Sequence, residues 1–173
     1  MKIITGKVRF SYANVWEPKS INGSEPKYSV SIIISKSDKE TLKKINDAIE
    51  EAKKVGISKL GDKIADNIKT PLHDGDTDRP EDEAYVGSYF INANSNTRPG
   101  IVNKSVQAIV DQSDFYSGCY GRASVVFYAY NTEGNQGIAC GLQNLQKLED
   151  GEMLRYHSSA EEDFGSVEED FLN

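Results

Sequence analysis

The chain has 173 residues, which suits one domain with appendages. No apolar run approaches the roughly 20 residues needed to span a bilayer, and the N-terminal sequence MKIITGKVRF has no apolar signal region, so we expect neither a membrane protein nor a secreted one. The net charge of −7, taken alone, argues against a polyanionic partner such as nucleic acid.

The N-terminal segment predicts a strand followed by a loop. Over residues 3–13 apolar and polar side chains alternate, which is typical of a strand with one buried face, and Lys7 and Arg9 belong to the polar face. Residues 14–27 contain two prolines and a glycine and therefore predict a loop. Its tryptophan, Trp16, has polar neighbours and is a candidate ring for stacking on a nucleic-acid base, although it could also anchor the loop to the core.

Residues 28–35 alternate in the same way and predict a second strand. A helix should follow, because Ser37 and Glu40 have the spacing of a capping box and apolar residues then recur every three or four positions. We expect Gly56 to end this helix.

The segment 57–84 predicts an insertion with one or two short helices and an acidic loop. Three alternating aspartates in the loop match the first ligand positions of a calcium-binding loop, but Arg79 and Tyr85 stand where that motif needs glycine and glutamate. We therefore expect no metal and no other cofactor. The three aspartates are Asp74, Asp76 and Asp78.

The sequence does not favour an enzyme. The P-loop, G-x-G-x-x-G and G-x-S-x-G motifs do not occur, and His73 and His157 have no nucleophile near them in sequence. A metal-dependent nuclease built on the acidic loop is an alternative, but neighbouring aspartates in one loop are poor evidence for a two-metal site. The two cysteines, Cys119 and Cys140, lack metal-binding spacing, and we expect them to be reduced and buried.

Residues 85–94 predict a third strand, in which Phe90 lies among serine and asparagine residues on the more polar face. A turn with Arg98 and Lys104 near its ends and a short strand over 105–112 are expected next. Phe90 is therefore a candidate stacking ring, and the two bases are candidate phosphate contacts.

The most regular pattern covers residues 120–130. One face is small or apolar and suits a core; it consists of Gly121, Ala123, Val125, Phe127 and Ala129. The other face carries Tyr120, Arg122, Ser124, Val126, Tyr128 and Tyr130. Rings beside a guanidinium favour sequence-tolerant binding of single-stranded nucleic acid, and Tyr116, just before the strand, is a further candidate. The alternative is that these tyrosines pack under a loop or in a dimer interface.

A turn-rich connection and a returning strand follow. The whole order is strand, loop, strand, helix with insertion, strand, short strand, long strand, hairpin and strand. A mainly β, OB-fold-like antiparallel barrel with an interposed helix accounts for this order, and an open sandwich is the alternative. An OB-fold binds oligonucleotides through one sheet face and the flanking loops. We expect the barrel to occupy residues 1–148.

The acidity of the chain is concentrated at its C-terminus. Residues 149–173 hold nine of the 27 acidic residues and one of the 20 basic residues, which leaves 18 acidic and 19 basic residues for the barrel. The net charge therefore does not exclude a nucleic-acid partner. Blocks of like charge are commonly disordered interaction tails, so we expect a disordered acidic tail here. Phe164 and Phe171 within it argue against a purely solubilising role.

Three stretches together resemble a tailed-phage family of single-stranded DNA-binding proteins. They are YFINANSNTRPGIV from Tyr89, DFYSGCYGRASVVFYAYNTEGNQGIACGLQNLQKLEDGE from Asp114, and the terminal EEDFLN. The resemblance covers most of the chain and is strongest from Tyr89 to Glu152, although Gln136 stands where the family pattern has lysine. The insertion at 57–84 adds little to it.

The resemblance implies an OB-fold, sequence-independent binding of single-stranded DNA in phage replication or recombination, no catalysis, and a location in the host cytoplasm. It also implies that the acidic tail contacts phage or host replication and recombination proteins and competes with DNA for the groove. The tail residues concerned are Glu168, Glu169, Asp170 and Phe171.

Stacking and phosphate neutralisation together assign eleven side chains to DNA binding. They are Lys7, Arg9, Trp16, Phe90, Arg98, Lys104, Tyr116, Tyr120, Arg122, Tyr128 and Tyr130. The alternative function is a virion or scaffold protein that uses the tyrosine face as a protein interface. A homodimer is compatible with either function.

Overall fold

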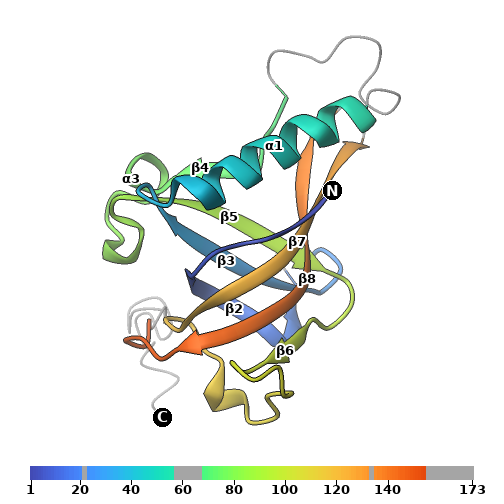
Figure 1. The fold of residues 1–173 in the computed structure, drawn as a ribbon. Coiled ribbons are helices and arrows are strands. Elements are labelled where there is room, and N and C mark those ends of the chain that lie inside the picture. Colours follow the sequence, from blue (N-terminus) through green and yellow to red (C-terminus); the bar gives the residue numbers. More distant parts are fainter. Residues whose placement is uncertain (21–22, 57–67, 133–134, 155–173) are drawn as a thin grey trace, which may run out of the picture.

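Five strands pair into a closed ring that forms the body of the protein (Figure 1). The computed structural model describes residues 1–20, 23–56, 68–132 and 135–154. The strands of the ring are β2 (Val8–Lys19), β3 (Lys27–Ser35), β5 (Ser88–Ser95), β7 (Tyr120–Thr132) and β8 (Asn135–Glu149). Neighbours are antiparallel except β5 and β8, which are parallel, and the pairing of β2 with β7 closes the ring. The predicted barrel is confirmed.

Three short strands extend the ring. β1 (Lys2–Ile4) pairs with β7, β4 (Leu72–Asp74) pairs with β5, and β6 (Gly100–Val102) runs parallel to β8. The single strand predicted over residues 3–13 is thus divided, because the chain turns at Gly6, whose amide donates to Thr41 Oγ1 on the helix at 3.0 Å. The strand predicted over 105–112 is wrong: Asn103–Gln107 forms a tight turn after β6 instead.

One long helix, α1 (Lys39–Val55), lies across one end of the barrel and packs against β7, β1 and β8 (Figure 1). Its apolar side chains, such as Ile45 and Ile49, are buried there. The predicted capping box is wrong, because Asp38 is the cap: its carboxylate accepts from the Thr41 amide at 3.1 Å. Gly56 ends the helix as predicted. Within the described ranges, no helix is long and apolar enough to cross a membrane.

The core fills the inside of the ring and follows the predicted alternation of β7. The five small or apolar β7 residues are all buried, whereas the six on the other face are half-buried or exposed. Cys119 and Cys140 are buried free thiols, as expected, and burial raises the pKa of both. The strand therefore has one structural side and one outer side.

The described part of the insertion, residues 68–84, lies against the barrel. This part contains β4, the short helix α3 (Gly75–Asp78) and a 3₁₀ turn at Glu83–Tyr85. Tyr85 is completely buried against Phe90 and Ile33 on the outer face of the sheet. The residues between this segment and α1, 57–67, lie outside the described ranges.

Candidate nucleic-acid interface

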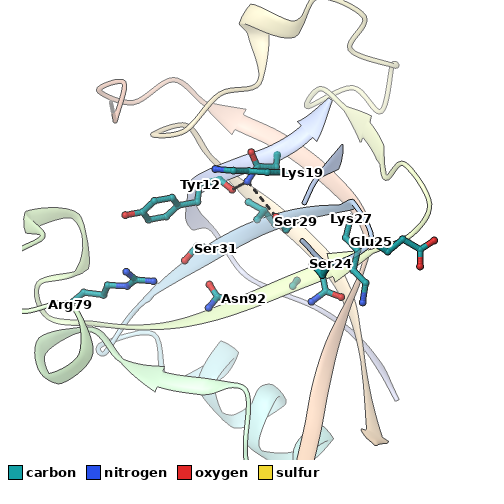
Figure 2. A pocket seen from close by; sticks show the side chains of 13 residues that line it. Tyr12, Lys19, Ser24, Glu25, Lys27, Ser29, Ser31, Arg79 and Asn92 are labelled. Carbon is teal, nitrogen blue, oxygen red and sulfur yellow. Dashed lines mark hydrogen bonds between the residues drawn. The ribbon is translucent and has the colours of Figure 1, made fainter. Parts of the chain in front are cut away.

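An open groove of about 310 Å³ crosses the outer face of β2, β3 and β5 (Figure 2). Strand register builds its floor, because Ser29 lies opposite Asn94 and Ser31 opposite Asn92, while the intervening Val30 is directed into the core. The groove is lined by Tyr12, Asn14, Lys19, Ser24, Glu25, Lys27, Ser29, Val30, Ser31, Arg79, Asn92, Ala93 and Asn94. The side chains of the floor are thus polar and small, and they leave room above them for a planar group such as a base.

The charge of the groove is positive. Its lining includes Lys19, Lys27 and Arg79 against one carboxylate, Glu25. Tyr12 and Arg79 lie at one end, and Glu25 and Lys27 lie at the other (Figure 2). A phosphate backbone would find cations at both ends of the floor.

Tyr12 and Arg79 form an aromatic and cationic end wall. The Arg79 guanidinium lies 5.5 Å from the centre of the Tyr12 ring. It also lies 5.8 Å from the ring centre of Tyr85 and 5.5 Å from that of Phe90. Tyr12 is 38% exposed, so its ring is accessible from the groove. A guanidinium plane and an accessible ring are both surfaces on which a base can stack.

Backbone geometry sets the direction of Tyr12. Its φ of 46° lies in the left-handed region, and the register of β2 against β3 shifts between Ser11 and Asn14. Such a bulge redirects the side chain relative to simple alternation. Tyr12 therefore faces the groove, although strict alternation from Val8 would place it on the inner face.

A buried hydrogen bond fixes the insertion at this end of the groove. The Tyr85 hydroxyl donates to Ser31 Oγ at 2.8 Å, and the Tyr85 ring meets Phe90 edge-on at 5.0 Å. Burial raises the pKa of the Tyr85 hydroxyl, so it stays protonated as the donor at neutral pH. The segment that carries Arg79 is thereby attached to the floor of the groove.

A second group of rings and cations lies where β2, β7 and β8 meet. This C-terminal contact cluster consists of Lys7, Arg9, Tyr116, Tyr120 and Lys147. The charged ends of Lys7 and Arg9 each lie 5.3 Å from the centre of the Tyr120 ring, and Lys147 lies 5.4 Å from that of Tyr116. Four of its five members were predicted as DNA contacts, and the fold brings these four together.

Residues 149–152 already occupy the C-terminal contact cluster. Lys7 pairs with Glu149, Arg9 donates to the Glu152 carbonyl at 2.8 Å, and Lys147 pairs with Asp150 at 2.5 Å. The hydrogen bond from Lys147 lowers the pKa of Asp150, and the Tyr116 hydroxyl donates to the same carboxylate at 3.0 Å. The end of β8 and the residues after it thus pair with Lys7 and Lys147 and hold Arg9 by a backbone carbonyl.

Trp16 and Arg98 form a further pair beside an open hollow of about 330 Å³. The Trp16 indole donates from Nε1 to the Phe115 carbonyl at 3.0 Å, and Arg98 lies 5.2 Å from the ring centre. Trp16 is half-buried against the main core, so it both anchors β2 and keeps part of its ring accessible. It lies in β2 rather than in the predicted loop.

The tyrosine face of β7 lies on a different wall. In a ring ordered β2, β3, β5, β8 and β7, the β7–β8 pair is across the barrel from β3. Tyr128 is 45% exposed there, and Tyr130 packs against Gly137. Arg122 donates to Gln146 Oε1 at 3.0 and 2.8 Å. These side chains are therefore not brought together with the groove.

Two further predicted residues lie away from the groove lining. Lys104 is exposed in the turn after β6, and its carbonyl accepts from Gln146 Nε2 at 3.3 Å. Phe90 corrects the expectation of an exposed ring, since it is 3% exposed and stacks on His73 at 5.1 Å. The insertion covers the polar face of β5 at this point, so Phe90 is not available to a base in this structure.

The acidic loop is bound internally rather than arranged for a cation. Lys36 pairs with Asp74 at 2.9 Å and with Asp76 at 2.8 Å, which lowers the pKa of both carboxyls. His73 lies 3.5 Å from Asp78. No group of metal ligands occurs among the residues that the structure describes. The tail residues Glu168, Glu169, Asp170 and Phe171 lie outside those residues.

Sequence reasoning missed the residues that line the groove. Alternation assigned Tyr12 to the inner face because it does not account for the bulge, and Arg79 was considered only as a residue that disrupts a calcium motif. Lys19 and Lys27 did carry a usable signal, because they flank the loop between the first two barrel strands, and that loop contributes to binding in OB-folds.

The closed barrel and the polar, basic groove on its β2–β3–β5 face define an OB-fold protein of the oligonucleotide-binding class. Residues 1–172 match the family described as "Enterobacter phage Enc34, ssDNA-binding protein". The chain belongs to this family of phage single-stranded DNA-binding proteins, which is not a family of enzymes.

Individual relatives agree with this assignment. The chain is 30% identical over 160 residues to "Putative protein p50" of Acyrthosiphon pisum secondary endosymbiont phage 1, covering 88% of this chain and 85% of that protein. It is similar to the single-stranded DNA-binding protein of bacteriophage Enc34, with a TM-score of 0.75 and 28% identity over 94% of this chain and 88% of that one. That protein has also been solved in complex with ssDNA. The gp2.5 protein of bacteriophage T7 shares the fold, with a TM-score of 0.59 and 14% identity over 98% and 96% of the two chains.

Proposed function

We propose that this protein binds single-stranded DNA without sequence preference in the groove on β2, β3 and β5, in support of phage replication or recombination. The observation that carries the proposal is the positive, open groove with an accessible ring and guanidinium at one end, on the sheet face that OB-folds use. Bases stack on Tyr12 and the Arg79 plane, and lysines neutralise phosphates. The side chains of the floor are small and polar, so the groove can accommodate any of the four bases.

In this proposal the bound DNA strand continues from the groove toward Trp16 and Arg98. Trp16 is two residues beyond Asn14 in β2, and Val15 between them is buried, so Asn14 and Trp16 share the outer side of the strand. Trp16 is the single tryptophan of the chain. Its fluorescence should therefore be quenched when oligo-dT binds, and salt should restore it because phosphate contacts are screened. Absence of quenching and of any change in the anisotropy of labelled oligo-dT would contradict the proposal.

The C-terminal tail competes with DNA for the groove. Met153 and Leu154, the last described residues, line a hollow together with Tyr12 and Arg79, so the tail begins beside the aromatic end of the groove. Residues 155–173 carry six acidic residues and one basic residue. A segment of this length spans up to roughly 60 Å when extended, which is ample to reach the lysine end.

A chain that ends at Leu154 tests the tail. It keeps the residues that contact the C-terminal contact cluster and removes the terminal Glu168, Glu169, Asp170 and Phe171, which we also propose as the contacts to replication proteins. We expect tighter binding of oligo-dT than by the full chain at low salt, and a difference that shrinks as salt screens the tail. Equal affinity at low salt would show that the tail does not compete.

One observation favours a protein contact as a second role. Tyr128 lines an apolar hollow of about 170 Å³ with Met1 and Val55, on the wall across from β3. Met1 and Val55 are 59% and 74% exposed. A homodimer through this wall would leave the groove free, and light scattering of the full chain with Tyr128→Ala as the comparison would detect it.

A further inference from the structure

Lys19 and Lys27 are a like-charged pair directly across two antiparallel strands. Lys19 ends β2, Lys27 begins β3, and the two are register partners. Like charges in directly opposite positions repel each other and destabilise the pairing of the strands. Both side chains are exposed and both line the groove. The pair is thus an unfavourable feature of the free protein at the site where a ligand is expected.

Neither lysine is neutralised within the described ranges. There, no ion pair or hydrogen bond joins the side chain of Lys19 or Lys27 to another group, although Glu25 lies in the same lining. Several other basic residues are already engaged: Lys7 with Glu149, Lys36 with Asp74 and Asp76, and Lys147 with Asp150. Among the residues that the structure describes, the two groove lysines therefore have no paired carboxylate, which leaves them able to bind an anion such as phosphate.

We infer that Lys19 and Lys27 form a phosphate-binding pair whose mutual repulsion is relieved when the backbone of single-stranded DNA lies against them. The inference rests on the proposed function and deepens it. Arg79, at the other end, already lies over the rings of Tyr12, Tyr85 and Phe90. The groove thus has a phosphate end at the loop between β2 and β3 and a stacking end at the insertion.

The test uses the full-length double variant Lys19→Gln/Lys27→Gln and a fluorescent oligo-dT probe, with affinity measured by anisotropy between 0.1 and 1 M salt. Each neutralised phosphate adds about 0.7 to the slope of log affinity against log salt for single strands. We expect the slope to become shallower by about 1.4 and the affinity at 0.1 M salt to fall about 25-fold, with little change near 1 M. Each single variant should lose about fivefold at 0.1 M.

A second readout is the stability of the free protein. Removing the repulsion should raise the melting temperature by about 1–3 °C without DNA, although the same change weakens DNA binding. A general loss of positive charge would not produce this combination. The matched control is Lys39→Gln/Lys54→Gln, which removes two exposed charges from α1, away from the groove strands. The control should keep the salt slope of the unmodified protein.

The outcomes separate the inference from the proposed function. If the unmodified protein binds oligo-dT and the groove variant keeps its slope, the lysine pair is not the phosphate site and the proposed function stands. A melting temperature that falls in the groove variant would overturn the claim of repulsion. If the unmodified protein does not bind oligo-dT at any salt concentration, the proposed function and the inference both fail.

Discussion

Replacing Tyr12 by alanine should weaken DNA binding while leaving the protein folded. Loss of one base–ring stack costs about 1–3 kcal/mol, which corresponds to an increase of about 5- to 150-fold in Kd. The ring is 38% exposed, so the change opens little of the core. It removes the contact with Arg79 at 5.5 Å. A partly exposed cation–π contact contributes about 0.5–1 kcal/mol, so the melting temperature should fall by only about 1–4 °C.

The chain provides a matched control for this change. Tyr128 is the same residue type with a similar exposed fraction, 45%, but it lies on the wall across the barrel from β3. Tyr128→Ala should change the Kd for labelled oligo-dT by less than about twofold, and Tyr12→Phe, which keeps the ring, should behave in the same way. Anisotropy at one fixed salt concentration measures the affinity, and circular dichroism measures the melting temperature.

The two tyrosine variants distinguish DNA binding in the groove on β2, β3 and β5 from DNA binding on the β7–β8 wall. If Tyr128→Ala loses affinity and Tyr12→Ala does not, DNA lies on the β7–β8 wall, as the alternation in the sequence suggested, and the groove assignment is wrong. If neither change has an effect, neither Tyr12 nor Tyr128 is a main stacking contact.

Two further changes test the support of the groove. Tyr85→Phe removes the buried hydrogen bond to Ser31 at 2.8 Å and should lower stability by about 1–2 kcal/mol, a fall of about 2–8 °C in melting temperature; an unchanged value would show that the bond contributes nothing. Lys36→Gln should lower the melting temperature at pH 7, because Lys36 lowers the pKa of Asp74 and Asp76 below the ordinary 3.8. That stabilisation is present above about pH 3.8 and is lost as both carboxyls are protonated, so the difference from the unmodified protein should close in acid; a constant difference across pH would contradict this.

The sequence was sufficient for most of the barrel because alternation reports burial directly. The β7 pattern correctly separated core from surface, and the order of strands and helix led to the OB-fold. The helix end at Gly56 followed from local chemistry in the same way. The start of the same helix did not follow, because Asp38 rather than Ser37 caps it.

The site was harder to predict because it depends on long-range contacts and on one backbone irregularity. The bulge at Tyr12 reverses the parity of β2, so alternation assigns this side chain to the wrong face. Phe90 was expected to be exposed, but a segment from the insertion covers it. Lys7 and Arg9 were predicted on the polar face of the first strand, but their contacts with Tyr120, Glu149 and Glu152 were not. None of these contacts can be read from sequence spacing.

Photocross-linking tests the central claim most directly. Single-stranded oligonucleotides that contain 5-iodouracil, irradiated in complex with the full chain and mapped by mass spectrometry, report which aromatic side chains contact bases. We expect cross-links at Tyr12, with Trp16 as a second site, and none at Tyr128 or Tyr130. Cross-links confined to Tyr128 and Tyr130 would contradict this expectation, because they would place the bases across the barrel from the groove.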